Sequence, residues 1–338
     1  MNSWSDRNAG LDRERSGREF AGLWDADPGS LRLVNDRINI VYRFEVCGRG
    51  MFLKVCAAAN RSMLEQRAAA EYLQHLASNG ADVCVPILSR NGRLIEEWRE
   101  GGDVFLGWVT DEAPGRVISL DAPTVAEFLA WGVALGKMHR AAESFEPSAE
   151  LTYLTWKDLW QQTRDGMDPE DSEPVWREYE QLTPWLVSLP ETSDVYGLTH
   201  TDIRTENAMW DGEQVRIIDF DEPVYHWYAS DVMRPFLEFA QLPADRFGPL
   251  FDAFLAGYRG VRQFPDTWVE ELPLFARMKN LGFYWWISVN STKKGDRYAE
   301  WLEGIRVRFG ATRLRLFHRH CVGPDTRTAG PSGPSGRG

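Results

Sequence analysis

The residues best suited to chemistry lie between positions 198 and 220, in the segment LTHTDIRTENAMWDGEQVRIIDF. His200, Asp202 and Asn207 follow the spacing H-x-D-x-x-x-x-N, and Asp219 comes at the end of a short apolar run that predicts a strand. The segment therefore places two carboxylates and a carboxamide close together, on a loop and at a strand end. Three kinds of chemistry could use such a set.

Glycoside hydrolysis needs two carboxylates across a sugar bond, but it has no use for Asn207. A structural metal site favours more His or Cys ligands. Phosphoryl transfer uses every part, because it needs an aspartate that orients a hydroxyl and accepts its proton. Asparagine and aspartate oxygens are also suitable ligands for Mg²⁺. The spacing therefore favours phosphoryl transfer, which further requires a lysine for the nucleotide phosphates.

The surrounding elements change character along the chain. Two β-prone runs, INIVYRFEV and MFLKV, flank the turn CGRG and predict a hairpin. SMLEQRAAAEYLQHLASNG has helical periodicity, and VCVPIL, GRLIEEW and VFLGWVT predict further strands. After the loop DEAPGR the segments are mostly helical. The pattern predicts an α+β chain with a small β-rich lobe joined to a larger helical lobe.

Four ranges follow from these changes. Residues 1–20 are polar and predict a flexible leader, and residues 21–110 form the β-rich, nucleotide-binding lobe. Residues 111–320 form the helical lobe, with the catalytic loop and the acceptor site. Residues 321–338 are rich in Gly, Pro and Ser and predict a disordered tail.

The segment HTDIRTENAMWDGEQVRIIDFDEP resembles the catalytic segment of the aminoglycoside phosphotransferase family, within the protein-kinase-like superfamily. Choline kinases, kinase-like homoserine kinases and a group of bacterial stress-response Ser/Thr kinases share this segment. The resemblance extends over roughly residues 35–320. It implies a bilobal protein-kinase-like fold with a small β-rich N-lobe and a larger α-helical C-lobe, and ATP and Mg²⁺ as cofactors.

The resemblance also implies roles for the catalytic segment. Asp202 is expected to be the catalytic base, and His200 a mostly architectural residue beside it. Arg204 is expected either to contact the transferred phosphate or to serve as a fixed surface charge. Asn207 and Asp219 are the implied metal ligands.

Further implied positions surround this segment. Asp231 should brace the catalytic loop by accepting backbone hydrogen bonds, and Asp221 and Glu222 could supply negative charge for an acceptor. The loop has Thr201 where the family most often has glycine, which adds bulk beside the base. The aromatic run at 283–286 is interpreted as core, with an acceptor-lining role for one or two rings as the alternative. His139 is interpreted as a packing or surface residue.

The nucleotide site is implied in the same way. Lys54 should contact the phosphates and pair with Glu71 rather than Glu65, since the two glutamates face different sides of their helix. The expected adenine contacts come from the backbone of Trp108, Val109 and Thr110.

The phosphate-covering loop departs from the expected glycine-rich pattern. The stretch NDRINIVYRF before Lys54 contains no glycine. Side chains such as Asn35, Arg37 and Asn39 are therefore expected to cover the phosphates.

Composition limits the partners and the compartment. The 338-residue chain is 43% hydrophobic and has a net charge of -12, so nucleic acid is not an expected partner. No apolar run reaches the ~20 residues needed to cross a bilayer, so no membrane partner is expected. Four cysteines without a C-x-x-C pair, and an N-terminus unlike a signal peptide, predict a cytoplasmic protein with reduced thiols.

The sequence thus predicts an ATP- and Mg²⁺-dependent phosphotransferase acting on a hydroxyl of a small polar metabolite. An amino-alcohol or an amino acid such as homoserine is the expected acceptor, and a monomer or homodimer the expected state. A Ser/Thr protein kinase of the stress-response type stays open as the alternative. A non-catalytic nucleotide-binding module is disfavoured, because Asp202, Asn207 and Asp219 are all present.

Overall fold

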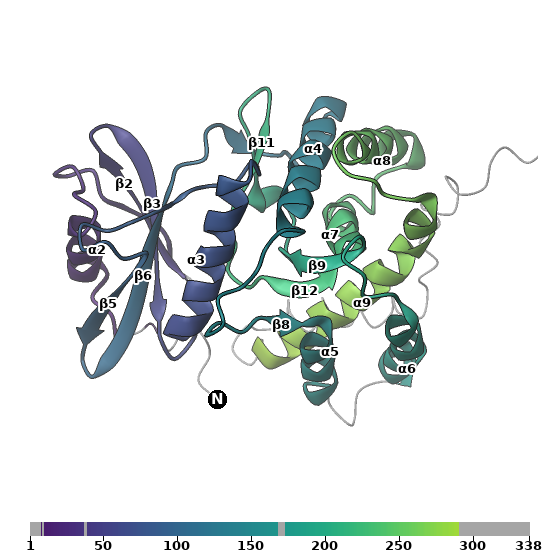
Figure 1. Cartoon of the computed structure of the whole chain (residues 1–338), viewed down its shortest axis with the longest axis horizontal. Coiled ribbons are helices and arrows are strands. Elements are labelled where there is room, and N and C mark those ends of the chain that lie inside the picture. The colour runs from purple at the N-terminus through teal and green to yellow at the C-terminus, as the bar shows by residue number, and fades with distance from the viewer. Residues whose placement is uncertain (1–7, 9, 37–38, 168–172, 291–338) are drawn as a thin grey trace, which may run out of the picture.

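A β-rich part and a helical part lie side by side in the chain (Figure 1). The computed structural model describes residue 8 and residues 10–36, 39–167 and 173–290. The expected α+β bilobal arrangement is confirmed, with strands dominating before residue 112 and helices after it. None of the helices in these described ranges is long and apolar enough to cross a membrane.

The N-terminal part is built on one six-stranded sheet with the order β1-β2-β3-β6-β4, and β5 pairs with β6. All its neighbouring strands run antiparallel. Its elements are α2 (Arg13–Gly22), β1 (Arg32–Asp36), β2 (Ile40–Val46), β3 (Arg49–Ala57), α3 (Met63–Ser78), β4 (Pro86–Ile87), β5 (Ile95–Glu100) and β6 (Asp103–Asp111).

Helix α2 corrects the expectation of a flexible leader for its residues 13–20, while residues 1–7 lie outside the described ranges. It covers the outer face of the sheet, and α3 lies between the sheet and the helical part (Figure 1). Phe20 of α2 is 1% exposed and joins a core with Leu53 and Val55 of β3. A Cβ at Gly107 of β6 would lie 2.7 Å from the Phe20 ring, so this close approach requires glycine. The sequence of α2 is mostly polar because a short amphipathic helix has only a few apolar residues, all on its buried face.

Phe20→Ala is expected to lower the free energy of unfolding by about 3–4 kcal/mol, since it empties a fully buried aromatic site. Urea unfolding of the purified protein measures this. Leu64→Ala, at a side chain 52% exposed on α3, should change the free energy of unfolding by no more than about 0.5 kcal/mol. Equal stability of the Phe20 variant and the wild type would show that α2 does not belong to the folded core.

The helical part holds the remaining elements, including two three-stranded sheets with the orders β11-β10-β7 and β8-β12-β9. They are β7 (Arg116–Val117), α4 (Val125–Ala142), β8 (Leu154–Thr155), α5 (Trp156–Asp165), α6 (Glu173–Ser188), β9 (Tyr196–Thr199), η1 (Thr205–Asn207), β10 (Ala208–Trp210), β11 (Val215–Ile217), β12 (Val224–Trp227), α7 (Tyr228–Met233), η2 (Arg234–Leu237), α8 (Ala244–Arg259) and α9 (Asp266–Asn290).

Helices α4 and α8 cross at backbone contact. A Cβ at Gly132 would lie 2.0 Å from the Phe254 carbonyl oxygen, and a Cβ at Gly257 would lie 2.0 Å from the Leu129 carbonyl oxygen. Only glycine allows two helix backbones to approach this closely. The crossing brings the C-terminal halves of both helices beneath the loop that follows β9, where the candidate site lies.

Candidate active site

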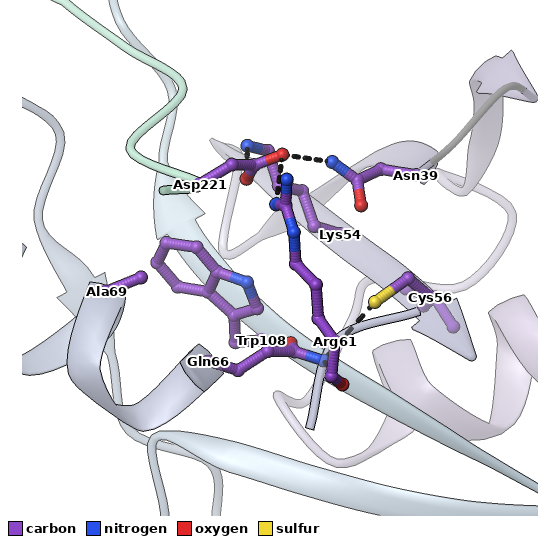
Figure 2. Close-up of a pocket in the computed structure, with 9 residues that line it drawn as sticks. Asn39, Lys54, Cys56, Arg61, Gln66, Ala69, Trp108 and Asp221 are labelled. Carbon is purple, nitrogen blue, oxygen red and sulfur yellow. Dashed lines mark hydrogen bonds and ion pairs between the residues drawn. The ribbon is translucent and has the colours of Figure 1, made fainter. Parts of the chain in front are cut away.

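Lys54 faces the helical part because of the alternation of strand β3. Its neighbours Leu53 and Val55 are fully buried in the core beneath α2. Successive strand residues face opposite sides of a sheet, so Lys54 emerges on the side of α3. There it lines a pocket with Trp108, whose ring centroid lies 5.8 Å from the ammonium (Figure 2). Its side chain is 20% exposed.

The Lys54 ammonium forms ion pairs with Asp219 and with Asp221, and the Asp221 Oδ1 atom lies 2.6 Å from Nζ. Asp221 also pairs with the Arg61 guanidinium at 2.6 Å and accepts a hydrogen bond from the Asn39 amide (Figure 2). Burial lowers the pKa of Lys54, but the two carboxylates outweigh it and raise that pKa above its ordinary value. The lysine is therefore charged and held in place by residues of the helical part.

The predicted ion pair between Lys54 and Glu71 is wrong. Glu71 instead accepts hydrogen bonds from the backbone N–H and the hydroxyl of Ser148, at 2.9 and 2.7 Å. Glu65, the rejected alternative, caps the N-terminus of α3 by accepting from the Ser62 backbone N–H at 2.7 Å.

The reason lies in the face that α3 presents to the pocket. Gln66 and Ala69, one turn apart, are the α3 residues that line it, and neither carries a charge. The compensating carboxylate comes instead from Asp221, two residues beyond the predicted metal ligand Asp219. Arg61, just before α3, balances the extra negative charge of this arrangement.

Asp221→Asn is expected to raise the KM for ATP by about 10-fold, because Lys54 loses a charged partner that holds its flexible stem. Glu71→Gln is the matched control and should leave this KM unchanged, since its carboxylate contacts only Ser148 among the described hydrogen bonds. Steady-state kinetics at varied ATP concentration measure the KM for ATP of both variants. A larger increase in the KM for ATP in the Glu71 variant than in the Asp221 variant would instead support the predicted ion pair between Lys54 and Glu71.

The loop after β9 is braced by Asp231, as predicted. The Asp231 carboxylate accepts hydrogen bonds from the backbone N–H groups of His200 and Thr201, both at 2.8 Å. Thr201 has a φ of 67°, a left-handed conformation that is unfavourable for a β-branched residue. The position thus favours glycine, the commonest residue in the resembling family, and the two hydrogen bonds hold the strained turn closed.

A buried histidine supports this brace. His139 of α4 is fully buried, with Nε2 3.3 Å from the Asp231 carboxylate and Nδ1 2.8 Å from the Tyr258 hydroxyl of α8. Burial lowers the pKa of His139, although the Asp231 carboxylate raises it. The sequence indicated a packing or surface role for His139, and its contact with Asp231 could not be read from spacing.

His200 connects the loop to the strand that precedes Asp219. Its Nδ1 accepts a hydrogen bond from the Asp202 backbone N–H at 3.2 Å, which leaves the proton on Nε2 for the Ile218 carbonyl at 2.9 Å. Both contacts are to the backbone, which fits the architectural role expected for His200. Through these two hydrogen bonds, His200 connects the backbone at Asp202 with the backbone of the residue before Asp219.

Asp202 faces solvent, with 45% of its side chain exposed. One carboxylate oxygen accepts from Arg234 at 2.9 Å, and the other accepts from the Asn207 amide at 3.3 Å. Burial raises the pKa of Asp202, and Arg234 and Lys279 outweigh this effect and lower it below the ordinary value. The carboxylate is therefore ionised at neutral pH, as required of a group that orients a hydroxyl.

Asn207, beside Asp202, and Asp219, beside Lys54, provide hard oxygen atoms. The Asn207 amide nitrogen donates to the Asp202 carbonyl at 3.0 Å, which leaves its amide oxygen as the group that can bind a cation. Asp219 has a φ of 74°, a left-handed conformation that non-glycine residues adopt mostly at functional sites and tight turns. Within the described ranges, no cluster of three or more His, Cys, Asp or Glu could hold a metal. One carboxylate and one amide fit Mg²⁺, which usually keeps waters and substrate phosphates as its other ligands.

The predicted adenine contacts require a correction. Trp108, Val109 and Thr110 lie inside β6, which pairs with β3 on one side and with β4 and β5 on the other. Their backbone groups are therefore used by the sheet. Even the next N–H groups, of Asp111 and Glu112, donate to the carbonyls of other segments. The chain leaves the sheet over residues 112–115, two to five residues after the predicted position.

The glycine-free phosphate loop is only partly described. Asn35 is exposed on β1, and Arg37 lies outside the described residues. Asn39 donates its amide to Asp221, so it belongs to the Lys54 network. Phosphate contacts from Asn35 and Arg37 stay predictions.

Asp221 and Glu222 do not supply free negative charge for an acceptor. Asp221 is occupied by Lys54 and Arg61, and Glu222 pairs with Arg61 at 2.7 Å. Arg204, by contrast, lies beside the base. Its Nε is 3.9 Å from the Asp202 carboxylate, and its guanidinium also pairs with Glu206.

Sequence reasoning missed Arg61, Arg234 and Lys279. None lies in a recognisable motif, and each reaches the site from a segment distant in sequence. A buried arginine is uncommon and marks a paired site, but burial is visible only in the folded chain.

Sequence comparison with known proteins also points to a phosphotransferase. The sequence profile of the phosphotransferase enzyme family matches residues 30–272. Amicoumacin kinase of Bacillus subtilis (strain 168) is 27% identical over 275 residues, which cover 79% of this chain and 82% of the relative. Homoserine kinase of Agrobacterium fabrum (strain C58) is 26% identical over 221 residues, which cover 63% of this chain and 65% of that relative.

A solved structure has the same fold. Amicoumacin kinase in complex with AMP-PNP, Ca²⁺ and Ami superposes with a TM-score of 0.83 at 24% identity, over 93% of this chain and 98% of that one. The family match covers well over half of the chain, and the resemblance expected from the catalytic segment is confirmed. The protein belongs to the phosphotransferase enzyme family and is a kinase-type phosphotransferase with a protein-kinase-like fold.

Proposed function

We propose that the protein transfers the γ-phosphate of ATP, in the presence of Mg²⁺, to a hydroxyl of a small polar metabolite of the amino-alcohol or amino-acid class. One observation carries the proposal: four residues from strand β3, the loop after β9 and the end of β11 form a connected set. Lys54 pairs with Asp219, Asn207 donates to Asp202, and the Asn207 carbonyl accepts from the residue before Asp219 at 3.0 Å. Phosphoryl transfer uses each member.

The residues fit the nucleotide and the metal by their chemistry. Lys54 is a compact, charged donor suited to phosphate oxygens, and its ion pairs show that it is held in the charged form. Asn207 and Asp219 would hold Mg²⁺ through oxygen atoms. When bound, Mg²⁺ supplies positive charge that neutralises the transferring phosphoryl group.

Asp202 performs the proton chemistry. It orients the acceptor hydroxyl and receives its proton while a bond forms between the hydroxyl oxygen and the γ-phosphorus. The bond from that phosphorus to the β–γ bridging oxygen breaks, and ADP leaves with this oxygen. Arg204, 3.9 Å from the Asp202 carboxylate, lies where it could compensate charge on the transferred group.

The relatives support a small acceptor. An amicoumacin kinase and a homoserine kinase are named for small molecules, and they align over 79% and 63% of this chain. Nothing in the described site favours a protein acceptor over these.

A panel of acceptors tests the proposal. ATP consumption is measured with amino-alcohols, hydroxy amino acids and a casein-type protein, each with and without Mg²⁺. Phosphate on a small molecule supports the proposal. Phosphate found on protein alone would favour the alternative Ser/Thr kinase, and the absence of Mg²⁺-dependent ATP consumption with all acceptors would contradict both.

A further inference from the structure

Two cations lie against the catalytic loop on the helical side of Asp202. Arg234 of η2 is only 4% exposed and donates to the Asp202 carboxylate at 2.9 Å. Lys279 of α9 is half-buried and donates to the Thr201 carbonyl at 2.5 Å. Because 45% of the Asp202 side chain is exposed, a molecule that approaches this carboxylate comes into the field of both positive charges.

The ring of Phe283 connects the pair. The Arg234 guanidinium carbon lies 5.0 Å from the ring centroid, and the Lys279 ammonium lies 5.7 Å from it. Two like charges over one ring repel each other at this range. Besides burial, the nearby Arg234 lowers the pKa of Lys279, while Asp202 raises it.

Three carboxylates, those of Asp202, Asp231 and Glu222, act on Lys279 through space, but in the described ranges none of them pairs with it directly. Asp202 pairs with Arg234, and within the described ranges Lys279 forms no ion pair. Arg204 is the next cation, and it has its own partner in Glu206. In the same ranges, the buried Nε of Arg234 has no hydrogen-bond partner.

A purely structural role explains this arrangement poorly. Arg234 alone would hold the Asp202 side chain, and a neutral donor could bind the Thr201 carbonyl. A second cation beside a buried guanidinium is costly without an anion. The carboxylate of an acceptor would give the ammonium a direct anionic partner and would add a second negative charge beside the guanidinium.

We propose that Arg234 and Lys279 bind the carboxylate of the acceptor, beside the hydroxyl that Asp202 orients. The inference rests on the proposed function and narrows its acceptor to hydroxy acids and hydroxy amino acids, in preference to amino-alcohols. The carboxylate takes no part in the transfer, since it only fixes the acceptor on the loop. The two groups are specificity-determining residues.

An acceptor bound through its amine is the rival class, and two groups of described residues that could bind an ammonium are already engaged. An ammonium could use the face of an aromatic ring, but the protein's own cations lie over Phe283. It could also use the carboxylates after the metal strand, but Asp221 is held by Lys54 and Arg61. The charge near Asp202 thus selects an anion.

Matched pairs of acceptors test the inference in turnover. L-homoserine is compared with L-homoserinol, 4-hydroxybutyrate with 1,4-butanediol, and glycerate with glycerol, at saturating ATP. Each carboxylate compound should have a kcat/KM about 10- to 100-fold above its neutral or amine-bearing partner, the range of a charge-assisted contact. Equal or better turnover of the compounds without a carboxylate would overturn the inference.

A variant separates acceptor binding from phosphoryl transfer. Lys279→Gln should lower kcat/KM for the preferred carboxylate acceptor by about 10- to 100-fold more than it lowers kcat/KM for the carboxylate-free partner, since any effect on Asp202 or on the loop is common to both acceptors. The control is Lys157→Gln, at an exposed lysine that also lies over a ring, 5.5 Å from Trp156. It should behave as the wild type. An equal loss with both acceptors would place Lys279 on the transferred phosphate and refute the carboxylate site.

A binding measurement tests the carboxylate site even if no acceptor is phosphorylated. Malonate should raise the thermal-unfolding midpoint of the full-length protein by about 2–4 °C at a concentration well above its Kd, and malonamide should not. The shift should persist in Lys157→Gln and disappear in Lys279→Gln. A malonate shift of equal size in Lys279→Gln, or no shift in any protein, would contradict the inference without bearing on the proposed function.

Discussion

Asp219→Asn is expected to lower kcat by roughly 10³-fold and to leave the fold unchanged. The neutral amide is a weak ligand for a hard dication, and it removes one of the two carboxylates that pair with Lys54. Asparagine tolerates the left-handed backbone at this position, where φ is 74°, better than any other non-glycine residue. The loss should therefore arise from chemistry rather than from unfolding.

Two measurements distinguish these causes. Thermal unfolding should have the same midpoint as in the wild type, and the stabilisation produced by ATP should no longer depend on added Mg²⁺. Asp211→Asn, at an exposed aspartate in the adjoining hairpin, is the control, because asparagine can accept the same turn hydrogen bonds. A folded Asp219 variant with near-normal kcat would remove Asp219 from the metal site.

Asp202→Asn is expected to lower kcat by roughly 10²- to 10⁴-fold with little change in the KM for ATP. The amide oxygen can still accept the hydrogen bond from Arg234, so the loop should keep its shape. What is lost is a group that can receive the hydroxyl proton. The ion pairs that hold Lys54, the proposed phosphate contact, do not involve this side chain.

Nucleotide titration and acceptor kinetics are measured separately to test this assignment. Asp266→Asn changes an exposed aspartate at the start of α9 and should leave both parameters at wild-type values. If Asp202→Asn abolished ATP binding, Asp202 would be a metal or structural residue and the base would have to be sought elsewhere.

The sequence predicted that three residues of the loop after β9 lie together, because they are local. His200, Asp202 and Asn207 lie within one turn-rich segment, where short spacings determine which groups can meet. Strand alternation likewise predicts that Lys54 faces away from Leu53 and Val55. The small β-rich lobe and the larger helical lobe also follow from periodicity alone, since the periods of strands and helices differ.

The position of the chain exit from the sheet was predicted less accurately. VFLGWVT was correctly interpreted as a strand, but the strand extends through Asp111 and its backbone groups are paired on both sides. Strand ends depend on which neighbours pair, and neighbours are chosen by the whole sheet. Helix α2 was missed for a related reason, because its few apolar residues gain their significance only from the sheet face that they cover.

The sequence by itself therefore determined the fold class, the reaction class and the residues that share one loop or one strand. The tertiary structure decided which distant charges meet: Asp221 rather than Glu71 pairs with Lys54, across 167 positions of sequence. It also brought Arg234 and Lys279 to Asp202 from two further helices. Periodicity states which face of a helix is buried, but the partner of a charged side chain depends on how each helix is rotated and docked. That rotation is set by packing over the whole core, which no local pattern contains.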